Sequence, residues 1–192
     1  MEQGILLLGG SHARPSRTGA LLRAVELMLQ RKGAEVEVWD LAERPLPLAD
    51  PAYYSRPGEH PAAAVRELAE AADLADGMVL ASPLYHNSYS GALKNALDLL
   101  STRQFEGKPV GLASNSGGAH GTQAVDHLRL VVRGLRGVAI PTQVVTLDGD
   151  YAPIDGGHRL ANPSIEERLE RFAEELLWFV ARLRGNAERT RE

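Results

Sequence analysis

The 192-residue chain contains no cysteine, which excludes disulfide bonds, thiolate catalysis, iron–sulfur ligation and cysteine-based zinc sites. Aromatic residues make up only 5% of the chain, and there is no excess of basic residues, since 21 Lys and Arg stand against 25 Asp and Glu. A net charge of −4 lacks the positive field that attracts nucleic acid or an anionic membrane surface. We therefore expect neither nucleic acid nor a membrane among the partners.

The sequence also has little that would direct it into or across a membrane. The apolar run near the start of MEQGILLLGG follows no basic segment and is too short for a signal peptide or a membrane span. We therefore expect a cytoplasmic protein. The chain has 44% hydrophobic residues, and its length is sufficient to bury a hydrophobic core. We expect a single domain over residues 1–184. A polar tail, residues 185–192, is expected to lack order.

Short apolar runs alternate with longer segments in which apolar residues recur at helical spacing. The runs expected to form strands are Ile5–Leu8, Val36–Trp39, Met78–Ala81, Val110–Ser114 and Gln143–Leu147. The segments expected to form helices are Thr18–Lys32, Pro61–Asp73, Ala92–Leu100, Thr122–Leu135 and Ser164–Leu183. This alternation predicts an α/β sandwich built on a parallel sheet. Ligands bind such sheets beyond the carboxyl ends of the strands, so the loops after the first, third and fourth strands are the candidate site.

The first loop, GGSHARPSRT (residues 9–18), brings hydroxyls and a guanidinium to the start of a helix. The groups concerned are Ser11, Ser16, Arg17 and Thr18. Helix-start amides and the helix dipole favour an anion, so this loop predicts a phosphate site. It lacks the lysine of a P-loop and the glycines of G-x-G-x-x-G, and the alternative is a long capped loop without a ligand.

The second loop, SPLYHNSYSGALKN (residues 82–95), is richer in side chains than a strand-to-helix turn requires. Leu84, Tyr85, His86 and Asn87 combine apolar surface, an aromatic plane and hydrogen-bonding groups. A flat heteroaromatic ligand needs that mixture. The alternative for Tyr85 and Tyr89 is ordinary packing or a subunit contact.

The third loop, SNSGGAHGT (residues 114–122), is dominated by small residues. Gly117 and Gly118 allow backbone amides to approach a ligand closely. The helix that follows favours negative charge at this place. We therefore expect this loop to line the edge of a ligand.

Other chemistry can be drawn from the same loops. His86, His120 and His127 form a conceivable metal site, but no H-x-x-x-H pair or carboxylate cluster accompanies them, so we expect no metal. Ser116, His120 and Asp126 form a conceivable hydrolase triad, but the G-x-S-x-G motif is absent.

Taken together, the three loops resemble those of the NADPH-dependent FMN reductase family of flavodoxin-like proteins, and the resemblance extends from Gly4 to about Arg184. GGSHARPSRTGALL is similar to the phosphate loop of that family, SPLYHNSYSGALKNALDLL to its ring-binding segment and KPVGLASNSGGAHG to its third flavin loop. The resemblance implies a three-layer sandwich with a five-stranded parallel sheet in the order 2-1-3-4-5 and helices on both faces.

The resemblance also implies a role for each loop. It places the phosphate of FMN on Ser11, Ser16, Arg17 and Thr18. It places the flavin ring and ribityl chain against Pro83, Leu84, Tyr85, His86 and Asn87. It places the pyrimidine edge of the ring beside Ser116, Gly117 and Gly118.

By resemblance, the activity is a ping-pong transfer of hydride from NADPH to bound FMN and then to a small acceptor, such as a flavin, a quinone, an azo compound or a metal ion. No catalytic side chain is expected, because the cofactor carries the chemistry. A homodimer or homotetramer is implied, with Ser90–Leu100 near the subunit contact. The alternatives are a reductase that releases its flavin to a partner monooxygenase and a flavodoxin-type electron carrier. His127 occupies the helix where flavin-releasing reductases can carry an extra tyrosine, which favours a retained FMN.

Overall fold

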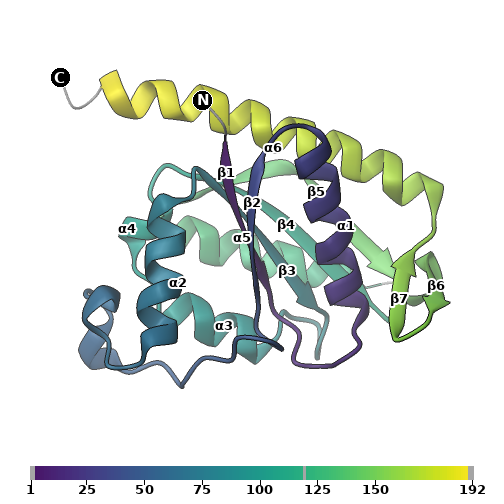
Figure 1. The fold of residues 1–192 in the computed structure, drawn as a ribbon, viewed down its shortest axis with the longest axis horizontal. Helices are drawn as coiled ribbons and strands as arrows, with labels where there is room; N and C mark the ends of the chain where they lie inside the picture. The colour runs from purple at the N-terminus through teal and green to yellow at the C-terminus, as the bar shows by residue number, and fades with distance from the viewer. Residues whose placement is uncertain (1–2, 119, 190–192) are drawn as a thin grey trace.

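The computed structural model describes residues 3–118 and 120–189, and its centre is a parallel sheet of five strands in the order β2-β1-β3-β4-β5. The strands of this sheet are β1 (Gly4–Gly9), β2 (Glu35–Asp40), β3 (Gly77–Pro83), β4 (Pro109–Ser116) and β5 (Val138–Leu147). Helices cover both faces of the sheet (Figure 1). The predicted fold class and strand order are confirmed.

The helices form the two outer layers. They are α1 (Arg17–Arg31), α2 (Ala63–Leu74), α3 (Gly91–Asp98), α4 (Thr102–Phe105), α5 (Thr122–Gly134) and α6 (Pro163–Arg189). Short 3-10 helices occur at Pro51–Tyr53, Pro57–Glu59 and Asp148–Asp150. Residues from α2, α3 and α5 pack in one apolar cluster, whereas residues from α1 and α6 pack in a second cluster on the other face.

Burial along the strands follows their position in the sheet. All residues of the interior strands β3 and β4 are buried, as a strand covered on both faces requires. Strand β2 lies at one edge, and its exposed and half-buried residues alternate up to Trp39. The helices alternate in the same way between a buried stripe and a polar face; in α1 the stripe includes Leu21, Leu22, Val25 and Leu29.

Three parts of the fold differ from the expectation. Strand β5 begins at Val138 and includes Pro141, which an edge strand tolerates because one side of its backbone needs no partner strand. A hairpin of β6 (Tyr151–Ile154) and β7 (Gly157–Leu160) follows β5, where no strand was expected. Helix α4 was not expected either.

The last helix begins and ends differently from the prediction. It starts at Pro163, one residue before the predicted start at Ser164, and the Oδ1 atom of Asn162 accepts the backbone N–H of Ser164 at 3.0 Å. The helix runs to Arg189, and the part of the predicted tail from residue 185 to 189 is therefore helical; residues 190–192 lie outside the described part of the chain. Within that described part, no helix is both long and apolar enough to span a membrane.

Candidate functional site

The three predicted loops begin side by side at the carboxyl edge of the sheet. The backbone N–H of Gly10, directly after β1, donates to the carbonyl of Ala81 in β3 at 2.7 Å, and the N–H of Leu84, directly after β3, donates to the carbonyl of Asn115 in β4 at 2.9 Å. A side chain at Gly10 is excluded, because its Cβ would lie 2.8 Å from the Cβ of Leu93 in α3. The close packing of α3 against the end of β1 thus brings the first and second loops together.

Two buried serines tie the second loop to the first. The Ser90 hydroxyl donates to the Gly10 carbonyl at 2.6 Å and accepts the N–H of Leu93 at 3.1 Å, so Ser90 also caps α3. The Ser82 hydroxyl accepts the Ser90 N–H at 2.9 Å and donates to the Pro83 carbonyl. Both hydroxyls donate and accept a hydrogen bond, so these two serines are buried without the free-energy penalty of an unsatisfied polar group.

The first loop delivers its predicted residues to the start of α1. Ser16 is the N-cap, and its side chain accepts the N–H of Gly19 at 2.9 Å. Ser11 and Thr18 are buried, Ser16 and Arg17 are half-buried, and the first turn of α1 contains no acidic residue. The amides of this turn and the positive end of the helix therefore remain available to an anion.

Arg17 has a buried donor that an anion at the first loop would satisfy. Its Nη1 lies 3.4 Å from Asp148 Oδ2, while its Nε is buried and has no hydrogen-bond partner among the described residues. A buried donor without an acceptor costs about 1–3 kcal/mol. A phosphate beside the start of α1 would supply the missing acceptor, so the residues present fit a phosphorylated ligand.

The second loop is a tight hairpin rather than an extended connection. The backbone groups of Tyr85 and Ser88 exchange two hydrogen bonds, at 2.8 and 3.0 Å. Between them His86 and Asn87 both have positive φ, 48° and 63°, as a two-residue turn of this hand requires. Left-handed backbone at residues other than glycine is unfavourable and is typically maintained at ligand sites. The turn leaves Tyr85, His86 and Asn87 exposed.

The remaining predicted residues of this site lie where the loops meet. Pro83 is buried at the end of β3 and Leu84 is half-buried. In the third loop Ser116 is buried, and its hydroxyl is used internally, donating to the Gly118 carbonyl at 2.7 Å. Gly117 and Gly118 are exposed. Helix α5 then starts without a side-chain cap. The N–H of Gln123 in its first turn donates to the His120 carbonyl at 3.0 Å, while the buried Oε1 of Gln123 has no partner among the described residues.

The sequence did not indicate a polar network behind the first and third loops. The Asn115 amide donates to Asp148 Oδ1 at 3.1 Å, and Thr146 Oγ1 lies 3.0 Å from Asn115 Oδ1 and 2.7 Å from the Tyr151 hydroxyl. With the contact between Asp148 and Arg17, this chain of contacts joins the segment after β5 to the start of α1. Burial raises the pKa of the Tyr151 hydroxyl well above its ordinary value. The only available signal was the position of Asp148 directly after a strand.

The three histidines weighed as metal ligands lie in different places: His86 in the second loop, His120 before α5 and His127 within it. His127 Nδ1 in α5 lies 3.0 Å from the Ser88 hydroxyl, which links α5 to the hairpin of the second loop. Among the described residues no group of three or more His, Cys, Asp or Glu side chains is placed to hold a metal ion.

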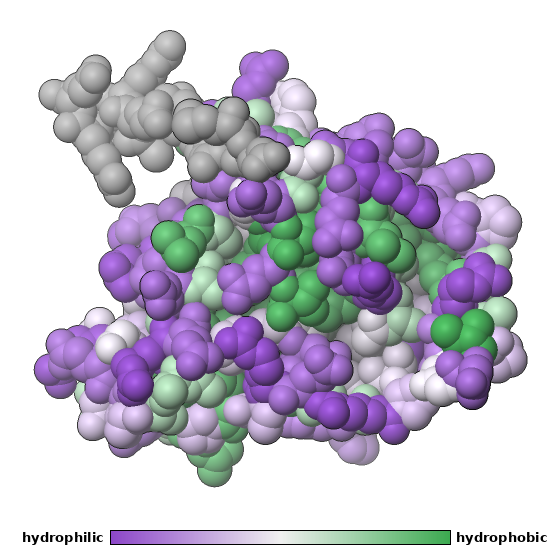
Figure 2. All heavy atoms as spheres, in the orientation of Figure 1, coloured by the Kyte–Doolittle hydropathy of each residue, from purple (hydrophilic) through white to green (hydrophobic). Residues whose placement is uncertain are grey.

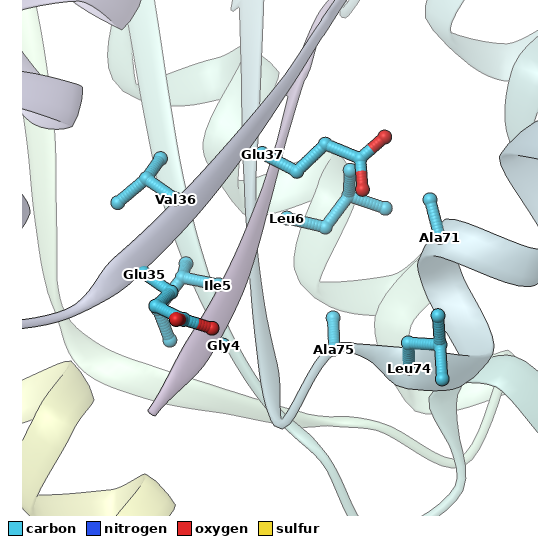
Figure 3. Close-up of a pocket in the computed structure, with 9 residues that line it drawn as sticks. All are labelled: Gly4, Ile5, Leu6, Glu35, Val36, Glu37, Ala71, Leu74 and Ala75. Carbon is cyan, nitrogen blue, oxygen red and sulfur yellow. The ribbon is translucent and has the colours of Figure 1, made fainter. Parts of the chain in front are cut away.

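A separate hollow of about 340 Å³ lies at the opposite end of the sheet (Figure 3). It is lined by the amino ends of β1 and β2, among them Gly4 and Glu35, and by the end of α2, including Leu74. Because the three loops leave the carboxyl ends of the strands, this hollow is not part of the site described above.

Comparison with known proteins agrees with this geometry. Two similar proteins are named FMN-dependent NADPH-azoreductase: one from Staphylococcus saprophyticus, 41% identical over 91% of this chain and 94% of its own length, and one from Staphylococcus aureus strain USA300, 38% identical over 93% and 95%. The structure of FerB, a flavoenzyme NAD(P)H:(acceptor) oxidoreductase from Paracoccus denitrificans, superposes with a TM-score of 0.74 at 19% identity, covering 94% of this chain and 98% of FerB; at that identity the likeness concerns the fold.

The family comparison covers all three loops. Residues 4–152 match the family described as NADPH-dependent FMN reductase, a range that includes β1 to β5 and Asp148. The chain belongs to the NADPH-dependent FMN reductase family.

Proposed function

We propose that the protein is an NADPH-dependent oxidoreductase that holds FMN at the carboxyl edge of its sheet and reduces a small acceptor. The family membership and the names of the staphylococcal relatives support the activity and both nucleotides. Azo compounds are the acceptor class that those names indicate. The observation in this chain that best supports the site is the buried Nε of Arg17 at the start of α1, which has no partner in the part of the chain that the structure describes.

FMN, when bound, supplies the redox chemistry, because its ring can take up a hydride from NADPH and pass two electrons to an acceptor. The chain contributes binding, orientation and electrostatics. Ser11, Ser16, Arg17 and Thr18 hold the phosphate. Pro83 and Leu84 form the inner wall of the ring site, and the exposed hairpin with Tyr85, His86 and Asn87 forms its outer wall.

The third loop can stabilise negative charge on the bound ring. Gly117 presents its backbone amide, Gly118, whose N–H donates to Ser116 Oγ at 3.1 Å, lies beside it, and the uncapped start of α5 contributes the positive end of a helix dipole. Preorganised donors of this kind stabilise negative charge that develops on a ligand edge. We assign them, together with Ser116, to the pyrimidine edge of the ring. Asn115, which contacts Asp148 beside them, keeps the loop in position.

The test starts from the visible spectrum of the purified protein. We expect FMN to co-purify or to be taken up at one equivalent, to remain bound through gel filtration and to be bleached by NADPH under anaerobic conditions. An azo dye should then reoxidise the bound flavin, which restores the absorbance of the protein, while the dye itself is reduced and loses its colour. Protein that takes up no FMN would refute the proposal. Loss of FMN on the column with full activity in its presence would instead favour a flavin-releasing reductase, and bound FMN that NADPH does not bleach would favour an electron carrier.

We further propose a cytoplasmic homodimer or homotetramer. Tyr85 and Leu130 are 52% and 59% exposed, and the contact between Ser88 and His127 lies between their elements. Exposed apolar side chains on two elements in contact can contribute to an interface. Sedimentation equilibrium should give a mass of two or four chains, and a concentration-independent monomer would contradict the proposal.

A further inference from the structure

A second hollow, the largest that we describe, lies away from the three loops. It has a volume of about 540 Å³ and is enclosed by α1, the β6–β7 hairpin and the first turns of α6. Its floor is apolar and includes Ala24, Leu27, Met28, Ile154, Leu160 and Leu169. Figure 2 shows hydrophobic surface gathered over α1 and below α6. Volumes of 300–1,000 Å³ with mostly apolar walls are typical of small-molecule sites.

The rim of this hollow has an excess of positive charge. Among the described lining residues, three arginines stand beside one acid, Glu166. Arg23 is neutralised by Glu26 at 2.5 Å, but Arg31 and Arg159 form no ion pair with any described residue. The chain as a whole has a net charge of −4, so this cationic rim is a local feature.

Exposed apolar surface at Leu27 and Ile154 would favour binding of an apolar ligand. Both are large apolar side chains that remain exposed to water, at 38% and 51%. A ligand body that covers them gains roughly 25 cal/mol for each Å² of apolar surface removed from water. The planar guanidinium groups beside them favour carboxylate or sulfonate oxygens, which they can bind in pairs.

We propose that the hollow binds a small apolar anion, an aromatic or aliphatic body that ends in one carboxylate or sulfonate group. The body lies on the floor between α1 and the hairpin, and the anionic group lies between Arg31 and Arg159. A second copy of the chain is the competing occupant. It fits less well, because the hollow is concave and its cationic rim would face the same arginines in a symmetric pair.

The binding experiment uses two probes of nearly the same shape that differ in charge. Naphthalene-2-sulfonate and the neutral naphthalene-2-sulfonamide are titrated by calorimetry into the FMN-loaded protein. The sulfonate should bind about tenfold more tightly at low salt, since two exposed cationic partners each contribute a factor of roughly two to five. The difference should shrink in 0.5 M salt, because screening weakens interactions between exposed charges.

Variants locate the binding. Arg31→Gln and Arg159→Gln should each weaken the sulfonate about two- to fivefold without changing the sulfonamide. Arg133→Gln is the matched control, because Arg133 is exposed in the last turn of α5 as Arg31 is in the last turn of α1, and it should change neither probe. Leu27→Gln should weaken both probes, whereas Leu48→Gln, at a leucine that is 85% exposed outside the hollow, should weaken neither.

The ring of FMN could also stack with a naphthalene probe, so the visible spectrum of the flavin is recorded during the titration. Binding in the hollow leaves that spectrum unchanged. The proposal is overturned by equal affinities for the two probes, by arginine variants that behave as Arg133→Gln does, or by binding that tracks a change in the flavin spectrum. It is also overturned if Leu27→Gln converts an oligomer into monomers, which would assign the hollow to a second copy.

Discussion

Replacement of Arg17 by glutamine tests the phosphate site most directly, because it removes the charge and the guanidinium donors. In the structure Arg17 has one weak ion pair, to Asp148 at 3.4 Å, with both side chains more than a third exposed. Such a pair contributes about 0–1 kcal/mol to the free energy of unfolding. The substitution should therefore leave the fold nearly as stable as before, and its effect can be read from binding.

The expected magnitude follows from what Arg17 lacks. Its buried Nε has no partner among residues 3–118 and 120–189, so a phosphate oxygen that accepts from it adds a charge-assisted hydrogen bond without breaking another. Bonds to charged groups contribute about 1.5–3 kcal/mol. Partial exposure and the competing carboxylate of Asp148 reduce this, and we expect a loss of about 1–2 kcal/mol, which is a weakening of FMN binding by about 5- to 30-fold.

Riboflavin makes the test specific, because it has the ring and ribityl chain of FMN but no phosphate. Fluorescence quenching of each flavin is measured with the apoprotein at low salt, for wild type, Arg17→Gln and the exposed control Arg133→Gln. We expect Arg17→Gln to change the affinity for riboflavin less than about twofold, so that the preference for FMN falls. Equal losses for both flavins would show that the substitution perturbs the loop. No loss for either would refute the assignment of Arg17 to the phosphate.

Three further predictions concern the structure around the site. Gly10→Ala places a Cβ 2.8 Å from that of Leu93 and should lower the free energy of unfolding by about 1–3 kcal/mol in urea titrations; unchanged stability would show that α3 can move away. Thr146→Val removes the partner of the buried Tyr151 hydroxyl and should cost about 1–3 kcal/mol, whereas Thr142→Val, whose hydroxyl has no hydrogen bond among the described residues, should cost less; equal costs would contradict the network. Burial raises the pKa of Tyr151 above its unfolded value of about 10, so its stabilisation is complete below that pH and is lost as pH rises further. The free energy of unfolding of the wild type should therefore fall more steeply above about pH 10 than that of Tyr151→Phe, and parallel curves would refute the assignment.

Local patterns were sufficient for most of the fold. Continuous apolar runs correspond to the interior strands β1, β3 and β4, and helical periodicity corresponds to the five long helices, because both patterns reflect which side of an element is buried. The β6–β7 hairpin and α4 escaped prediction because each strand and the helix are only four residues long, too short for burial to leave a periodic signal. Strand β5 was predicted only from Gln143 because Pro141 interrupts its pattern, and the edge position that tolerates this proline is a property of the sheet.

For the site, the sequence by itself determined which loops to inspect and which residue types they contain, since parallel strands place all their carboxyl ends at one edge. Only the tertiary structure decided how those residues are used. It engaged the Ser116 hydroxyl within its own loop and bent His86 and Asn87 into a left-handed turn. It also placed Asp148 beside Arg17, a contact between residues far apart in the chain. Such contacts depend on how separate elements pack together, and no local pattern of residues encodes that distance.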